Sequence, residues 1–183
     1  MTFVYVVRCN FTEPAKEAAW NAWYSGPKIA QMLAQPYFLT CQRFRRIAGT
    51  GRDYLALWTL QSPQAFETAQ YRSQWGFSEW TPYITDWSRD LFDGGARSEA
   101  AFAVPPDGAL HVVSFDGASA DVAIAQPGLL WLPVAGLDRH TAMIGLAPLP
   151  VLATARLPSN DQAQRMQAAI YRPICNMMHA PRA

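Results

Sequence analysis

Apolar residues in the first half of the chain recur with the two-residue period of strands and with the longer period of helices. Residues 2–9 (TFVYVVRC) are β-branched and aromatic, which is typical of a buried strand. Residues 54–60 (YLALWTL) are apolar at odd and even positions, so both faces of that strand are expected to be buried. The same patterns predict strands over 37–47 and 88–94, a hairpin turn over 48–53, and a helix from a Ser62 cap to about residue 70.

An interrupted helix is predicted after the first strand. Thr12 is a suitable N-cap, and the aromatic and small residues that follow, as far as Tyr24, recur at helical spacing. Gly26-Pro27 should break this helix, because proline lacks the amide donor and clashes with the preceding turn. Lys28 follows the break, and we expect its side chain to be exposed or half-exposed.

The second half repeats this order of elements without repeating its residues. The stretch FAVPPDG (102–108) has the turn residues of a linker, so the chain is divided into a first half, 1–103, and a more divergent second half, 104–183. The pattern of the second half predicts strands over 109–117, 128–137, 151–157 and 171–177, a helix over 119–125, and a helix over 161–170 with Asn160 as its cap.

Each half can be written strand–helix–strand–strand–helix–strand, the order of a ferredoxin-like βαββαβ unit. Such a unit has an antiparallel sheet with its helices on one face. A sheet that is apolar on both faces needs a second cover besides those helices. The sequence therefore predicts an α+β protein of two ferredoxin-like subdomains whose antiparallel sheets pack as an α+β barrel. The cover is either the second half of this chain or a second chain, which would make the protein a homodimer.

Composition and charge argue against several classes of partner. The net charge of +1 gives no basic surface for nucleic acid. Charged residues are only 16%, against about 25% in average domains, which suggests a lined cavity or an interface. No apolar run approaches the roughly 18 residues of a membrane-spanning helix. Cys9, Cys41 and Cys175 are odd in number and far apart, which favours reduced thiols and a cytoplasmic location.

Three stretches of the first half resemble EthD-like proteins of the dimeric α+β barrel superfamily: WNAWYSGPKIAQMLAQPYFLTCQRF, DYLALWTLQSP and YRSQWGFSEWT. The resemblance covers about residues 3 to 95. It matches a Trp-Tyr pair at Trp23-Tyr24 and an Arg-aromatic strand end at Arg43-Phe44. The chain departs from the family where a histidine is usual, because Lys28 stands there. The superfamily includes cofactor-independent oxygenases, polyketide cyclases, lactone isomerases and haem-binding members, so the resemblance implies the fold more firmly than a reaction.

Aromatic residues of the first half suggest an apolar pocket for a flat organic ligand between helix and sheet, although ordinary core packing would use the same residues. Trp23 is expected to be the more buried of the Trp-Tyr pair, with the Tyr24 hydroxyl at the cavity mouth. Arg43 could bind a carboxylate or an enolate, or form a salt bridge with Asp53 or Glu67. The candidate ligand-binding residues are Trp23, Tyr24, Lys28, Arg43, Tyr54, Trp58 and Trp80.

Motifs for other chemistry are lacking in the sequence. His111, His140 and His179 are far apart and have no metal-ligand spacing, so no metal site is expected. Nucleophile elbows and phosphate-binding glycine loops are also missing. We therefore expect a protein that binds a small hydrophobic ligand without a cofactor. One hypothesis is an isomerase, cyclase or oxygenase of an aromatic or polyketide-like metabolite. The alternative is a non-catalytic binding or accessory protein that has lost the family-like histidine.

Overall fold

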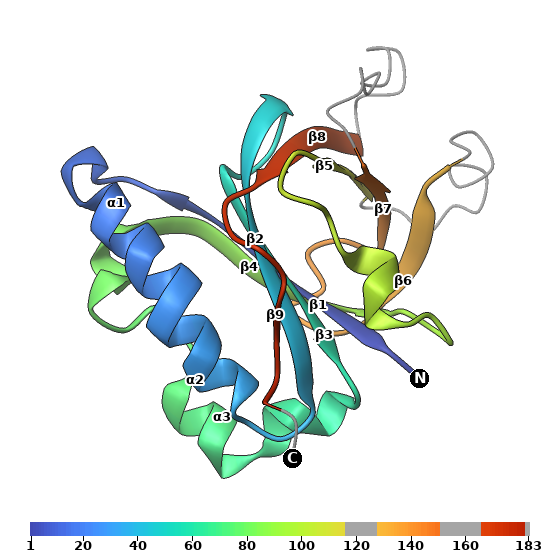
Figure 1. Ribbon diagram of the computed structural model, residues 1–183, viewed down its shortest axis with the longest axis horizontal. Coiled ribbons are helices and arrows are strands. Elements are labelled where there is room, and N and C mark those ends of the chain that lie inside the picture. The colour runs from blue at the N-terminus through green and yellow to red at the C-terminus, as the bar shows by residue number, and fades with distance from the viewer. Residues whose placement is uncertain (116–127, 151–165, 182–183) are drawn as a thin grey trace.

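The computed structural model describes residues 1–115, 128–150 and 166–181 (Figure 1). The strands are β1 (Phe3–Phe11), β2 (Phe38–Gly49), β3 (Tyr54–Leu60), β4 (Ile84–Asp93), β5 (Ala109–Phe115), β6 (Leu130–Leu137), β7 (Met143–Leu149), β8 (Met166–Pro173) and β9 (Met178–His179). The α-helices are α1 (Pro14–Trp23), α2 (Ile29–Leu33) and α3 (Ala69–Gln74). A π-helical turn, η1 (Tyr24–Lys28), joins α1 to α2, and three 3₁₀ turns are η2 (Pro63–Glu67), η3 (Ser78–Tyr83) and η4 (Glu99–Phe102).

Eight of these strands close into a barrel. Their order is β3-β1-β4-β6-β7-β5-β8-β2, and β2 pairs back with β3, so the sheet has no first or last strand among the eight. All of the pairings are antiparallel. The short strand β9 is added to the edge of β2 beside β8. Closure of this kind removes the exposed edges that would otherwise invite pairing with another chain.

The two halves of the chain contribute equally to the barrel. Strands β4-β1-β3-β2 form one run of neighbours, and β8-β5-β7-β6 form the other in the same relative order. The runs meet where β4 pairs with β6 and where β8 pairs with β2. The second cover that the sequence required is therefore supplied by this chain itself, and a second chain is not needed to close the barrel.

Strand β3 shows why both sheet faces had to be covered. All seven of its residues are buried, as its sequence predicted. Leu55 and Leu57 point into the barrel and join an interior cluster that includes Phe92 and Leu110. Trp58 belongs to a second cluster on the outer face, which the helices of the first half cover (Figure 1). The first-half sheet thus lies between a barrel interior on one face and a helical layer on the other.

One end of the barrel interior is polar. The guanidinium of Arg8 donates to Asp90 Oδ2 at 2.8 Å, to Ser114 Oγ at 2.7 Å and to Thr141 Oγ1 at 2.7 Å. The backbone amide of His140 donates to the other oxygen of Asp90 at 2.8 Å. Arg8 and Asp90 come from the first half, whereas the other three residues come from the second. This buried ion pair therefore ties the halves together with directed contacts.

The helix of the first half does not break at Gly26-Pro27, which corrects the sequence prediction. It runs from Pro14 to Leu33 through the π-helical turn η1. The Ile29 amide reaches back to the Tyr24 carbonyl, and this wider turn accommodates a proline that can neither donate a hydrogen bond nor fit a normal turn.

The start of that helix also differs from the prediction. Glu13, and not Thr12, occupies the cap position, without a capping hydrogen bond from its side chain. The Thr12 hydroxyl donates instead to the carbonyl of Tyr83.

The second half agrees with the sequence in part. Strands β5 and β6 lie where strands were predicted, whereas β7 was not predicted. Residues 166–170 were read as the end of a helix but begin strand β8, because pairing with β5 and β2 outweighs the helical preference of Gln and Ala. The predicted helix over 119–125, the strand over 151–157 and the Asn160 cap lie outside the described residues.

Candidate functional site

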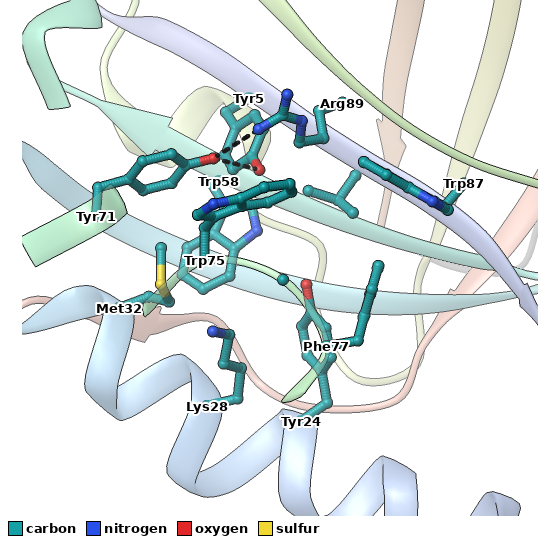
Figure 2. Close-up of a pocket in the computed structure, with 12 residues that line it drawn as sticks. Tyr5, Tyr24, Lys28, Met32, Trp58, Tyr71, Trp75, Phe77, Trp87 and Arg89 are labelled. Atoms are coloured by element: carbon teal, nitrogen blue, oxygen red, sulfur yellow. Dashed lines mark hydrogen bonds between the residues drawn. The ribbon is translucent and has the colours of Figure 1, made fainter. Parts of the chain in front are cut away.

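An inner pocket lies between the outer face of the first-half sheet and the helices that cover it (Figure 2). The sheet contributes residues of β1, β3 and β4, and the other wall comes from η1, α2, α3 and the loop after α3. Its lining residues are Tyr5, Val7, Tyr24, Lys28, Met32, Trp58, Tyr71, Trp75, Gly76, Phe77, Trp87 and Arg89.

Lys28 is a buried cation on the helical side of this pocket. Its side chain projects from the π-helical turn toward the sheet (Figure 2), and the residue is only 5% exposed. The ammonium donates to the backbone carbonyl of Gln74 and forms no ion pair with a described carboxylate. Burial lowers the pKa of Lys28 to about 8. The expectation of an exposed lysine is therefore wrong, because the unbroken helix turns this residue toward the sheet.

A cluster of two hydroxyls and a guanidinium faces Lys28 from the other side of the pocket (Figure 2). The hydroxyls of Tyr5 and Tyr71 lie 3.3 Å apart, and Arg89 Nη1 reaches the Tyr71 hydroxyl at 3.5 Å. Burial raises the pKa of Tyr5 well above its usual value, so this phenol stays neutral and can donate a hydrogen bond at physiological pH. An anionic oxygen placed here would meet donors from three side chains.

Asp138 holds Arg89 in place from the second half of the chain. Its Oδ1 lies 3.1 Å from Arg89 Nη2, and its Oδ2 accepts from the Arg89 backbone amide at 2.9 Å. The guanidinium also lies 4.5 Å from the Trp75 ring and 5.7 Å from the Trp87 ring. The second half of the chain therefore fixes a charged group that lines the pocket of the first half.

Arg43 lies beneath the pocket and does not line it. Its guanidinium is buried against the rings of Trp20, Tyr24 and Tyr54, at 4.7, 4.2 and 5.7 Å. Its hydrogen bonds go to neutral acceptors: the Ser25 hydroxyl and the side-chain and backbone oxygens of Asn21.

No described carboxylate pairs with Arg43. The proposed bridge from this strand to Asp53 or Glu67 is replaced by two others. Arg46 pairs with Asp53, and Arg45 pairs with Glu17.

The remaining candidates divide between the pocket and its surroundings. Tyr24 and Trp58 line the inner pocket. Tyr54 lies under it, where its hydroxyl bonds Glu17 and Asn21. Trp23 and Trp80 pack on each other outside the pocket, with ring centroids 6.3 Å apart.

The expected order of burial in the Trp-Tyr pair is reversed. Tyr24 is 5% exposed and belongs to the outer-face core, whereas Trp23 is only half-buried. The continuous helix explains the reversal, because it turns the Tyr24 side of the pair toward the sheet.

Sequence reasoning missed the polar side of the pocket. Tyr5 and Arg89 lie on predicted strands, and Tyr71 lies on a short helix, but nothing local joins these three residues. Their juxtaposition depends on β1 pairing with β4 and on α3 packing over both. Alternation could have placed Tyr5 on the helix-covered face, since it is two residues from Val7 and four from Cys9.

The histidines and cysteines do not form a metal site among the described residues. His111 lies on β5, His179 lies on β9, and His140 donates its backbone amide to Asp90. The three cysteines are free thiols. In the described part of the chain, no helix is long and apolar enough to cross a membrane.

Neither a protein-family model nor a protein of curated function matches this sequence. Solved structures do match its fold over nearly the whole chain. An anthrone oxidase-like protein superposes with a TM-score of 0.62 at 12% identity, covering 99% of this chain and 94% of the other. A candidate monooxygenase from Lactobacillus acidophilus NCFM gives 0.53 at 7% identity, covering 99% and 100% of the two chains. A candidate chlorite dismutase gives 0.51 at 12% identity and covers 95% of each chain. These likenesses show that the chain has the fold of dimeric α+β barrel proteins.

Proposed function

We propose that this protein is a cofactor-independent enzyme of the oxygenase type that acts on a flat, hydrophobic, weakly acidic metabolite in the inner pocket. The observation that carries the proposal is the position of Lys28, a buried amine that pairs with no described carboxylate and faces the Tyr5–Tyr71–Arg89 cluster. The anthrone oxidase-like and monooxygenase-like structures that share this fold support the choice of reaction type. We also propose that residues 1–103 and 104–183 are two ferredoxin-like repeats, as their shared strand order suggests.

Lys28 would be the general base. With a pKa of about 8, about one tenth of the lysine is neutral at pH 7, and this fraction grows steeply toward pH 8. The neutral amine would take a proton from an acidic C–H or O–H of the ligand. The negative charge of the resulting anion is delocalised over the ring system. The apolar walls of the pocket can pack against such a ring system.

The Tyr71 hydroxyl and the Arg89 guanidinium would stabilise the ligand oxygen on which negative charge develops. In an oxygenase this anion reduces dioxygen, the two combine as a hydroperoxide, and loss of water leaves a ketone. The balance is one CH₂ group and one O₂ giving one C=O group and one H₂O. Lys28 returns the first proton to the peroxide oxygen, which gives the hydroperoxide, and then transfers the second C–H proton to the hydroxide that leaves as the O–O bond breaks.

Anthrone is a suitable probe, because its oxidation follows this balance and consumes oxygen. We expect oxygen uptake matched by anthraquinone formation, with a rate that rises with pH and levels off above about 8. Lys28→Met should lower the rate by roughly two orders of magnitude or more. Lys16→Met is the matched control, because Lys16 is the other lysine of the chain and is exposed outside the pocket.

A Lys28→Met variant that turns over as fast as the wild type would refute the role of this lysine. Binding of the probe without turnover by the wild type would instead favour the second function, a non-catalytic protein that binds the same class of ligand.

A further inference from the structure

A second cavity opens on the outer side of the inner pocket. We call it the outer groove, and its lining residues are Trp75, Gly76, Phe77, Ser78, Thr81, Ile84 and Trp87. Trp75, Gly76, Phe77 and Trp87 line both cavities and therefore form the wall between them. Figure 2 shows Trp87 and Phe77 on the side of the inner pocket away from Tyr71.

The two cavities differ greatly in size. The inner pocket has a volume of about 30 Å³, which is room for a few water molecules or for the polar edge of a ligand. An engineered cavity that holds benzene measures about 150 Å³ by comparison. The outer groove has about 370 Å³. A ring system that places one acidic edge at Lys28 must therefore keep most of its bulk in the outer groove.

The shared wall suits a flat aromatic ligand. The rings of Trp75 and Trp87 lie 6.1 Å apart, and those of Phe77 and Trp87 lie 6.2 Å apart. Trp75 is 44% exposed and Trp87 is 40% exposed, which is unusual for such large apolar side chains. The groove residues carry no charge, so the surface offers stacking and dispersion and no ionic contact.

The wall also contains a glycine, Gly76. Gly76 joins Trp75 to Phe77 with a φ of +92°, a conformation that residues with a Cβ rarely adopt. Apart from its two chain neighbours, no residue has an atom within 4 Å of where its Cβ would be. The backbone is therefore open at this point of the wall, where a flat ring can approach it closely.

We propose that the outer groove is the subsite for the distal rings of the ligand. The substrate is therefore an aromatic compound of at least two fused rings, with its acidic hydroxyl or methylene on the edge that faces the inner pocket. This inference rests on the proposed function only where it places the acidic group of the ligand at Lys28. The groove would bind the distal rings whether or not Lys28 acts as a base.

The test uses phenol, 2-naphthol and 2-hydroxyanthracene, which carry the same hydroxyl on one, two and three rings. Dissociation constants are measured by calorimetry, or by ligand-observed NMR for the weakest. In the wild type, affinity should rise by roughly tenfold for each added ring until the groove is filled.

The decisive variant is Thr81→Trp, which fills the groove from an exposed residue that does not line the inner pocket. It should abolish the gain from the second and third rings and weaken phenol binding least, because a single ring occupies only the part of the groove next to the inner pocket. Ser73→Trp is the control, since Ser73 is exposed on α3 and lines neither cavity.

Equal affinity for the three compounds in the wild type would overturn the proposal. So would a Thr81→Trp variant, folded by its melting curve, that keeps the full dependence on ring number. Lys28→Met separates this result from the proposed function: it should lose turnover and keep the ring dependence. Ring dependence without turnover by the wild type would thus refute the enzyme and leave the subsite standing.

Discussion

The guanidinium of Arg43 lies 4.2 Å from the centre of the Tyr24 ring, although only Tyr24 lines the pocket. Arg43 is buried and is held by three aromatic rings and by neutral oxygens of Asn21 and Ser25. Burial lowers the pKa of this arginine without neutralising it. The contact fixes the π-helical turn on the sheet, so Arg43 supports the site from below.

Arg43→Lys should therefore destabilise the protein by about 2–3 kcal/mol, because a lysine cannot stack a planar group on the rings or reach both acceptors. Urea unfolding measures the change. Arg45→Lys is the matched control on the same strand, where an exposed pair with Glu17 at 3.3 Å should be worth less than about 1 kcal/mol. Equal losses at the two positions would contradict the supporting role of Arg43.

The pKa of Lys28 predicts how stability depends on pH. The folded-state pKa is lowered to about 8 from 10.5, so between these values the unfolded chain binds more protons than the folded one. Stability then rises with pH across this window, and the cost of a buried charge is fully present below about pH 8.

The free energy of unfolding of the wild type, relative to Lys28→Met, should increase by on the order of 2 kcal/mol from pH 7.5 to 10.5. Urea titrations at several pH values measure this difference, and Lys16→Met should show no such rise. NMR of ¹³C-labelled lysine gives the pKa directly, because the chain has two lysines and Lys16→Met leaves one signal. A midpoint near 10.5 would show that Lys28 is solvated.

The Arg8–Asp90 pair inside the barrel should be costly to break. Asp90→Asn leaves a buried guanidinium without its counter-charge and should destabilise the protein by about 3–5 kcal/mol. The pair of Arg52 and Asp86, at 3.1 Å, provides the control, because the Asp86 carboxylate is exposed and Asp86→Asn should cost less than about 1 kcal/mol. Calorimetric melting distinguishes them. A double variant, Arg8→Met with Asp90→Leu, should recover part of the loss, since it removes both charges.

Gly49 tests the junction between the halves. It adopts a φ of +83°, and a Cβ there would lie 2.1 Å from the Ala168 carbonyl oxygen on β8. Gly49→Ala should destabilise the protein by about 3 kcal/mol, through both the backbone conformation and the clash. Gly76→Ala shares the positive φ without the contact and should cost about 1 kcal/mol. Similar melting temperatures for the two variants would argue against close pairing of β2 and β8.

The sequence by itself determined those helices and strands whose pattern of apolar residues is compatible with one structure only. Strand β3 has apolar residues on both faces, so both faces had to be buried, and this implied a second cover for the sheet. Leu130–Leu137 also formed a strand where its apolar residues predicted one, although only Leu132 of this strand is fully buried. The pattern of apolar residues is enough to predict these strands, because an apolar segment is buried whichever other segment covers it.

Only the tertiary structure decided where the barrel closes and what the pocket contains. Residues 166–170 have no strong strand preference and became a strand through pairing with β5 and β2. Tyr5, Tyr71 and Arg89 meet across more than sixty residues of sequence. Lys28 was turned inward because a π-helical turn absorbed Pro27, so helix continuity prevailed over the local signal for a break. Each outcome depends on contacts between segments that are distant in the sequence. The free energy of such contacts cannot be read from the residues of one local segment.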